Sequence, residues 1–171
     1  NRPFPATAVA TANRTDTDSR PRVLLTRRIP ASVLSKLEAD CDVELYDGGA
    51  PLTAAELVHR LQGKQGLVCV LTDPVNADVL AAAPDLKVVA NIAVGYDNIN
   101  VAAAHARHIV VTNTPDVLTQ STAEFTWALI LAVTRRLVEG ERLVRRGGWK
   151  GWALDFMLGM ELGGKQLGII G

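Results

Sequence analysis

The chain has 171 residues, of which 48% are apolar, and its 18 Lys and Arg residues balance its 18 Asp and Glu residues. This length allows one domain of ordinary size and part of another, and the apolar content is enough for a packed core. A neutral balance gives no strong field for nucleic acid or an anionic membrane, and the longest apolar run is too short to span a bilayer. We therefore expect no nucleic-acid partner and no membrane partner.

The two cysteines, Cys41 and Cys69, lie in or beside strand-like apolar runs and lack the spacing of a metal site or a disulfide pair. We expect no bound metal, two free thiols and a reducing, cytoplasmic compartment. Residues 1–20 show no hydrophobic period. They are expected to form a disordered tail, with a transit peptide as the alternative.

From residue 21 onward, strand-like segments alternate with helix-like segments. The alternation predicts a parallel sheet with helices on both faces, in a five-stranded flavodoxin-like unit of class α/β over residues 21–115. Continuous apolar runs such as residues 66–71 are typical of strands covered on both faces. The expected strands cover residues 22–26, 42–46, 66–71, 86–92 and 109–112, and the helices between them begin near Pro30, Thr53, Asn76 and Asn98.

Two capping boxes predict helix starts, because a hydroxyl and a carboxylate three residues apart can satisfy free amides there. The first is Thr53 with Glu56, and the second is Ser121 with Glu124. The second box is expected to open one long helix, from residue 122 to about residue 146. Its first half is apolar almost all round, which predicts burial on several sides.

The last part of the chain has less regular signal. Residues 149–162 include Trp149 and Trp152 and show little regular pattern, so we expect them to form an irregular arm. The arm could dock onto another surface, such as a second subunit, or fold onto its own domain. Residues 163–171 then read as a short apolar strand that runs into Gly171, which is how a dinucleotide-binding unit begins. An ordinary buried strand with a turn is the alternative.

Several motifs, taken in order, resemble one family. L-T-D-P-V at 71–75, N-I-A-V-G-Y-D-N-I-N at 91–100, V-T-N-T-P-D-V-L-T at 111–119, S-T-A-E-F-T-W-A-L at 121–129 and L-G-G-K-Q-L-G-I-I-G at 162–171 are similar to the D-isomer-specific 2-hydroxyacid dehydrogenases. T-R-R-I-P at 26–30 and G-G-W-K-G-W at 147–152 resemble the glyoxylate/hydroxypyruvate reductase branch. The resemblance extends from about residue 21 to the end of the chain, which looks like the N-terminal part of a longer protein.

The resemblance implies a substrate-binding (catalytic) domain over residues 21–117. Residues 118–171 would then hold the linking helix and the first strand of a truncated Rossmann NAD(P)-binding domain. The implied activity is hydride transfer between NAD or NADP and a small 2-oxo or 2-hydroxy acid, with glyoxylate or hydroxypyruvate as the expected substrate and a homodimer as the expected assembly. A non-catalytic, cofactor-sensing corepressor or scaffold on the same fold is the alternative.

The expected substrate site centres on Val94 and Gly95, which follow a strand just before a helix, where backbone amides can converge on an anion. By resemblance, these two amides bind the substrate carboxylate, although Gly95 could instead merely permit a turn. Leu71 would pack on the carbon chain of the substrate. The resemblance also implies that one tryptophan, Trp152 or alternatively Trp149, would reach a neighbouring active site across a dimer. Asp73 is interpreted as a turn residue and not as a base.

By resemblance, Thr122 would contact the cofactor near its nicotinamide end, although it could instead only cap the helix. Gly171 would be the first glycine under the pyrophosphate. None of the histidines, His59, His105 and His108, has a carboxylate at a sequence spacing that would indicate a catalytic pair. None is therefore expected to be the catalytic acid or base. The resemblance implies that the catalytic Arg, Glu and His lie downstream. No catalytic residue is therefore expected in this chain, which alone is expected to be inactive.

Overall fold

The computed structural model describes residues 20–170, and the chain divides into two compact units between Thr114 and Pro115. Arg20 is the first described residue, and its guanidinium donates a hydrogen bond of 2.7 Å to the carbonyl oxygen of Glu38. The expectations for residues 1–19 and for Gly171 lie outside the described residues.

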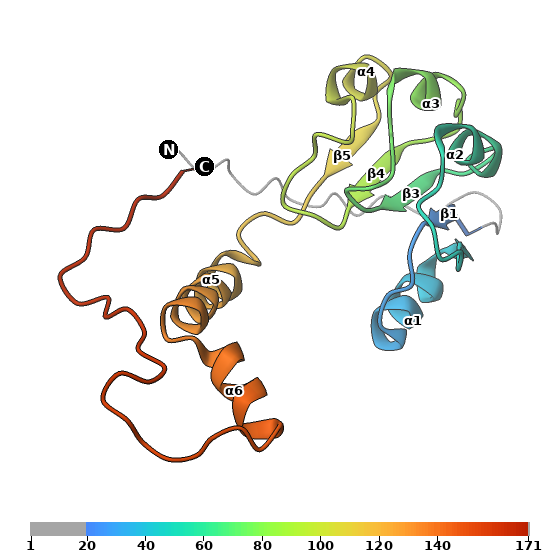
Figure 1. Ribbon diagram of the computed structural model, residues 1–171. Helices are drawn as coiled ribbons and strands as arrows, with labels where there is room; N and C mark the ends of the chain where they lie inside the picture. Colours follow the sequence, from blue (N-terminus) through green and yellow to red (C-terminus); the bar gives the residue numbers. More distant parts are fainter. Residues whose placement is uncertain (1–19, 171) are drawn as a thin grey trace. The chain divides into compact units, whose positions relative to one another are not determined.

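The first unit is built on five parallel strands in the order β2-β1-β3-β4-β5 (Figure 1). Adjacent strands pair in register, so that Leu24 lies beside Glu44 on one side and Leu67 on the other. This is the flavodoxin-like order, and the predicted α/β fold is confirmed. The strands are β1 (Arg22–Leu25), β2 (Asp42–Leu45), β3 (Gly66–Cys69), β4 (Val88–Asn91) and β5 (Val110–Thr112).

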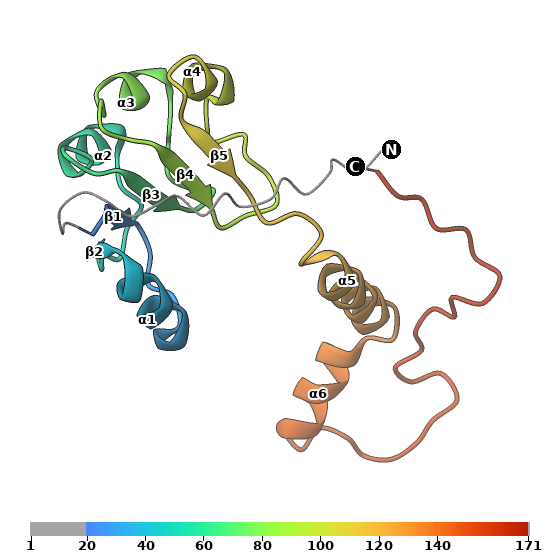
Figure 2. The ribbon, with the colours of Figure 1, turned by 180° about the vertical axis from the view of Figure 1, so that it is seen from behind.

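Helices cover both faces of the sheet, as predicted (Figures 1 and 2). Three short helices, α2 (Ala54–Arg60), α3 (Ala77–Ala81) and α4 (Val101–His105), pack side by side on one face, and α1 (Ala31–Asp40) lies on the other. The main core lies under α2, α3 and α4, where leucine and valine side chains from strands and helices are fully buried. Helix α1 contributes no buried residue.

The first predicted capping box forms at the start of α2. The Thr53 hydroxyl accepts a hydrogen bond from the Glu56 amide at 3.3 Å, and the Glu56 carboxylate accepts one from the Thr53 amide at 2.8 Å. The predicted cap at the start of α3 also forms, because the Asn76 side chain accepts from the Val79 amide at 3.0 Å. Local side-chain chemistry therefore determines where these two helices begin.

The single long helix predicted after residue 122 is wrong, because the structure has two helices, α5 (Thr119–Thr134) and α6 (Leu137–Arg145). The break falls at Arg136, whose φ of 54° is left-handed. The Thr134 carbonyl accepts a hydrogen bond from the Met160 amide at 2.7 Å, and a Cβ on Gly159 would lie only 2.5 Å from that oxygen. The arm thus packs closely on the break, in contacts that no helix propensity reveals.

The second predicted capping box does not form either. Helix α5 begins at Thr119, and Ser121 lies inside it, because the Thr122 amide already donates to the Leu118 carbonyl at 2.9 Å. Glu124 accepts instead from the Gln120 side chain at 2.7 Å. Because the helix starts upstream of the box, the Glu124 amide that the Ser121 hydroxyl would have satisfied lies beyond the first turn, where amides bond within the helix.

The predicted burial of α5 and the predicted strand over residues 167–170 are also absent from the structure. No residue of α5 is buried, and Phe125 and Val133 are 64% and 75% exposed. Residues 147–170 contain no helix or strand, and residues 115–170 as described supply no strand for residues 167–170 to pair with. A strand needs such a partner for its backbone hydrogen bonds. Among the helices of residues 20–170, none has the length and apolar character needed to cross a membrane.

The two capping boxes give a matched test. Thr53→Ala should lower the free energy of unfolding by about 1 kcal/mol, because it removes an N-cap hydrogen bond. Ser121→Ala should change it by less than about 0.5 kcal/mol, because Ser121 is an exposed residue inside α5. Urea unfolding followed by circular dichroism measures both, and equal losses for the two variants would contradict the helix starts described above.

Candidate functional site

The loops that leave the carboxyl ends of the strands meet at one edge of the sheet, because all five strands are parallel. Three of the predicted substrate residues lie there: Leu71 follows β3, and Val94 and Gly95 follow β4. A Cβ built on Gly95 would lie 3.8 Å from Cδ2 of Leu71, so the structure makes these two residues neighbours. Leu71 and Val94 are 56% and 43% exposed, which leaves an apolar surface beside the Gly95 backbone.

The amides of Val94 and Gly95 point away from the end of β5. The carbonyl before Val94, that of Ala93, accepts a hydrogen bond of 2.9 Å from the Thr114 amide, and the Val94 carbonyl accepts one of 2.8 Å from the Asn113 side chain. In a trans peptide the N–H points opposite to the C=O, and none of the described peptides is cis. Within residues 20–170, neither amide donates a hydrogen bond. Two neighbouring free N–H groups on a fixed backbone are the donors that an anion-binding concavity needs.

Hydrogen bonds from two asparagine side chains, Asn91 and Asn98, anchor this loop. Asn91, only 2% exposed, donates to the Gly95 carbonyl at 2.8 Å and to the Asn98 side-chain oxygen at 3.2 Å. Asn98 in turn donates to the carbonyls of Val70 and Asp73, at 3.2 and 3.1 Å. These bonds join the loop after β3 to the loop after β4. They keep Leu71 beside Gly95.

Asp73 has the contacts of a turn residue. Its carboxylate is fully buried and accepts hydrogen bonds from the Thr26 hydroxyl at 2.5 Å and from the Val70 amide at 2.9 Å. The Arg27 guanidinium lies 3.9 Å from the other carboxylate oxygen and donates to the Thr72 hydroxyl at 3.1 Å. The carboxylate therefore fixes its own loop and the end of β1, and it is not presented to a ligand.

The other predicted site residues belong to the second unit. Thr122 lies on α5 and is exposed. Trp152 is 81% exposed and lines a hollow of about 660 Å³ together with Trp149, Phe156 and residues of α6. Their expected roles, toward the cofactor and toward a neighbouring active site, stay predictions.

The histidines lie at the opposite edge of the sheet. His59 and His105 are in the last turns of α2 and α4, and His108 lies in the turn that leads into β5. A helix that connects two parallel strands runs back toward their amino ends, so its last turn is far from the carboxyl edge. Within residues 20–170, no three His, Cys, Asp or Glu side chains gather as metal ligands would.

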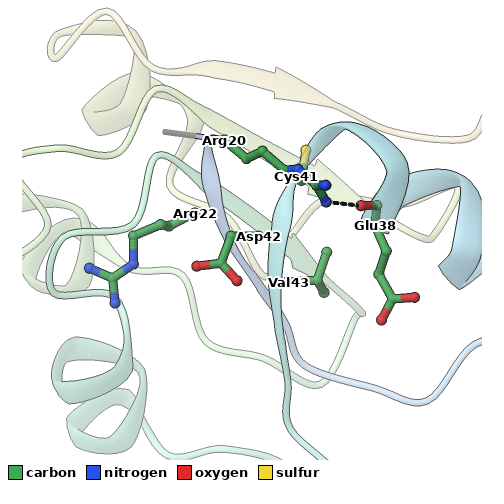
Figure 3. A pocket seen from close by; sticks show the side chains of 6 residues that line it. All are labelled: Arg20, Arg22, Glu38, Cys41, Asp42 and Val43. Atoms are coloured by element: carbon green, nitrogen blue, oxygen red, sulfur yellow. Dashed lines mark hydrogen bonds between the residues drawn. The ribbon is translucent and has the colours of Figure 1, made fainter. Parts of the chain in front are cut away.

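A polar hollow of about 500 Å³ also lies at the amino edge, beside the first residues of β1 and β2 (Figure 3). Arg20, Arg22, Cys41 and Asp42 are among the residues that line it. Ligands of open parallel sheets bind outside the carboxyl ends of the strands. We therefore place the candidate site at the Val94–Gly95 loop and not in this hollow.

Sequence reasoning missed the three asparagines that hold the loop, Asn91, Asn98 and Asn113. Their signal was present, because each belongs to a motif that begins in the last residues of a predicted strand. What the motif does not show is the partner of each side-chain amide, which only the pairing of β3, β4 and β5 brings within reach.

The fold and the loop define a class of protein, namely α/β proteins with a flavodoxin-like parallel sheet and free backbone amides at its carboxyl edge. The family model of the D-isomer specific 2-hydroxyacid dehydrogenase, catalytic domain, matches residues 23–152. The match covers more than half of the chain, and the chain belongs to this family.

Known relatives are similar to this chain in sequence and in fold. The glyoxylate reductase of Korarchaeum cryptofilum is 48% identical over 153 residues, which are 89% of this chain and 46% of that protein. The TT0316 protein of Thermus thermophilus is 44% identical, with a TM-score of 0.76 over 82% of this chain and 45% of its own. The NADPH-dependent glyoxylate/hydroxypyruvate reductase of Sinorhizobium meliloti, solved with NADP and malonate, is 35% identical, with a TM-score of 0.62 over 77% of this chain and 40% of its own. The chain thus spans about half the length of the relatives it matches.

Cys69 gives a test of the interior beneath the site. Burial, helped by the nearby Asp73 charge, raises the pKa of this thiol from 9.0 to about 12, and the thiol lies 3.5 Å from the Asn91 side-chain oxygen. The neutral thiol therefore contributes stability that is fully present below about pH 9 and is lost as the pH rises through about 12.

At pH 8, iodoacetamide should label the partly exposed Cys41 and leave Cys69 unmodified, because the thiolate is the reactive form. Mass spectrometry of peptides from the folded and the denatured chain measures this. Denatured chain should be labelled at both cysteines. Rapid labelling of Cys69 in the folded chain would contradict its burial.

Proposed function

We propose that this chain supplies the substrate-binding part of an NAD(P)-dependent oxidoreductase that acts on the CH–OH group of 2-hydroxy acids. The observation that carries the proposal is the pair of free, anchored amides of Val94 and Gly95 beside the exposed side chain of Leu71. Such an arrangement suits a carboxylate with a short carbon chain. Membership of the D-2-hydroxyacid dehydrogenase family supports the reaction class.

Glyoxylate or hydroxypyruvate is the proposed substrate. Two relatives that are 48% and 46% identical to this chain are named glyoxylate reductases, and both acids carry the carboxylate that the two amides suit. Each hydrogen bond from an amide to a charged oxygen contributes about 1.5–3 kcal/mol. Leu71 would pack on the carbon chain.

NAD or NADP is the proposed cofactor, and it would donate or accept the hydride. Thr122 is the candidate contact within residues 20–170, through its exposed side chain, and Gly171 is the candidate beyond them. The described residues therefore fit the substrate better than the cofactor. We propose accordingly that residues 21–117 form the substrate-binding domain and that residues 118–171 begin the NAD(P)-binding domain.

The catalytic proton transfer is not assigned to this chain. All of its histidines lie toward the amino edge of the sheet, and the one carboxylate buried beside the candidate loop, that of Asp73, is held by Thr26 and Val70. We expect the purified chain to bind a 2-hydroxy acid without NADH- or NADPH-dependent reduction of glyoxylate.

We also propose a homodimer in the cytoplasm. The large apolar side chains of α5 and of the arm are exposed, including Trp127 at 51% and Trp152 at 81%. Exposed apolar patches of this kind mark protein interfaces. The two free cysteines suit a reducing compartment.

Titration of the ¹⁵N-labelled chain with glycolate tests the carboxylate site. Glycolate should shift the amide resonances of Val94 and Gly95, because their N–H groups would donate to the carboxylate. Glycolamide, a neutral molecule of the same shape, should shift them far less. Equal effects of the two compounds, or no shift at either residue, would refute the proposed site.

Gly95→Ala is the matched variant. The added methyl group meets only Leu71, at an ordinary distance of 3.8 Å, so the fold should be retained. It projects toward the proposed ligand position, however, and should weaken glycolate binding by about tenfold or more, equivalent to about 1.4 kcal/mol. Gly49→Ala, which adds a methyl group in open space, is the control and should leave the affinity unchanged.

A further inference from the structure

We propose that Asn113 is a positioning residue for substrate, because its side chain fixes and polarises the peptide group that carries the Gly95 N–H. The inference rests on the function proposed above, in which that N–H binds a carboxylate. It assigns a role to a residue just past the carboxyl end of β5 that acts through the backbone of a neighbouring loop.

The geometry begins with the single hydrogen bond that Asn113 makes to the loop. Its side-chain amide donates to the Val94 carbonyl at 2.8 Å. That carbonyl and the Gly95 N–H belong to the same planar peptide group and point in opposite directions. Holding the carbonyl toward the end of β5 therefore aims the Gly95 N–H in the opposite direction, away from β5.

The neighbouring donor is fixed by a different group. The Val94 N–H shares its peptide with the Ala93 carbonyl, which accepts from the backbone amide of Thr114 at 2.9 Å. A backbone bond survives any substitution of side chains. Of the two proposed carboxylate donors, only Gly95 depends on a side chain for its aim, and that side chain is Asn113.

Asn113 also strengthens the donor that it aims. Hydrogen bonds in a chain polarise one another, so a donor on the Val94 carbonyl increases the positive charge on the Gly95 hydrogen. An anion that accepts from this hydrogen would extend the chain from Asn113 through the peptide to the carboxylate. The effect adds more to the affinity for an anion than to that for a neutral molecule of the same shape.

The position of Asn113 separates this role from a structural one. Asn113 is partly exposed and lies outside the buried core cluster, whereas Asn91 is 2% exposed, donates to Gly95 and Asn98, and accepts from the Cys69 thiol. Loss of the Asn113 side chain should therefore leave the fold intact and release mainly the peptide between Val94 and Gly95.

The test compares Asn113→Ala and Asn113→Leu with the wild-type chain. Leucine keeps the size of asparagine without its amide, so a packing defect is distinguished from a lost donor. Asn76→Ala is the control, because it removes another asparagine hydrogen bond, the cap of α3, from the same unit.

The first readout needs no ligand. The ¹⁵N order parameter of the Gly95 amide should be near 0.85 in the wild type and in Asn76→Ala, and should fall below about 0.6 in both Asn113 variants. The order parameter of the Val94 amide should fall less, because the bond from Thr114 remains. An unchanged Gly95 order parameter in both Asn113 variants would overturn the inference.

The second readout is the dissociation constant for glycolate from the same spectra. Both Asn113 variants should bind about tenfold more weakly, while Asn76→Ala binds as the wild type does. Wild-type affinity in both Asn113 variants would overturn the inference and leave the proposed function standing. If the wild type itself fails to bind glycolate, the proposed function fails, and with it the role of Asn113 toward substrate.

Discussion

A peptide group points its N–H opposite to its C=O, and the first unit uses this constraint in three successive peptides. The carbonyls of residues 93–95 accept hydrogen bonds from Thr114, Asn113 and Asn91 in turn. Because these carbonyls are held by the protein, the amides paired with them are directed elsewhere. The proposed carboxylate site, the exposure of the Val94–Gly95 loop and the role inferred for Asn113 all depend on these three bonds.

The bonds exist only because the sheet order brings distant segments together. Strand β4 lies between β3 and β5, so a residue just past β5 can reach a loop that leaves β4 about twenty residues earlier. On the other side, Asn98 joins the same loop to the carbonyls of Val70 and Asp73. The network is polar and partly buried, and such networks rigidify what they hold when every member is satisfied. A rigid loop with free amides suits anion binding without reorganisation.

The second unit differs from the first, because contacts within it bury no residue of its two helices. Helix α5 buries none of its residues, and the arm after α6 forms neither helix nor strand. Its most specific contact is at the helix break, where Gly159 passes so close to the Thr134 carbonyl that a side chain would collide with it. The apolar surface of this unit is what a larger assembly would cover, and this is the physical basis of the proposed dimer.

The sequence by itself determined the five strands, their α/β class, the starts of α2 and α3, and three residues of the candidate site, Leu71, Val94 and Gly95. Those features follow from apolar runs, local caps and loop motifs, which act over a few residues. Tertiary structure decided the rest. It placed Leu71 beside Gly95, gave the partners of Asn91, Asn98 and Asn113, broke the helix at Arg136 and left residues 167–170 without strand structure. Each of these depends on a hydrogen-bond partner or a close contact remote in sequence, or on its absence from the described chain, and no local pattern encodes that.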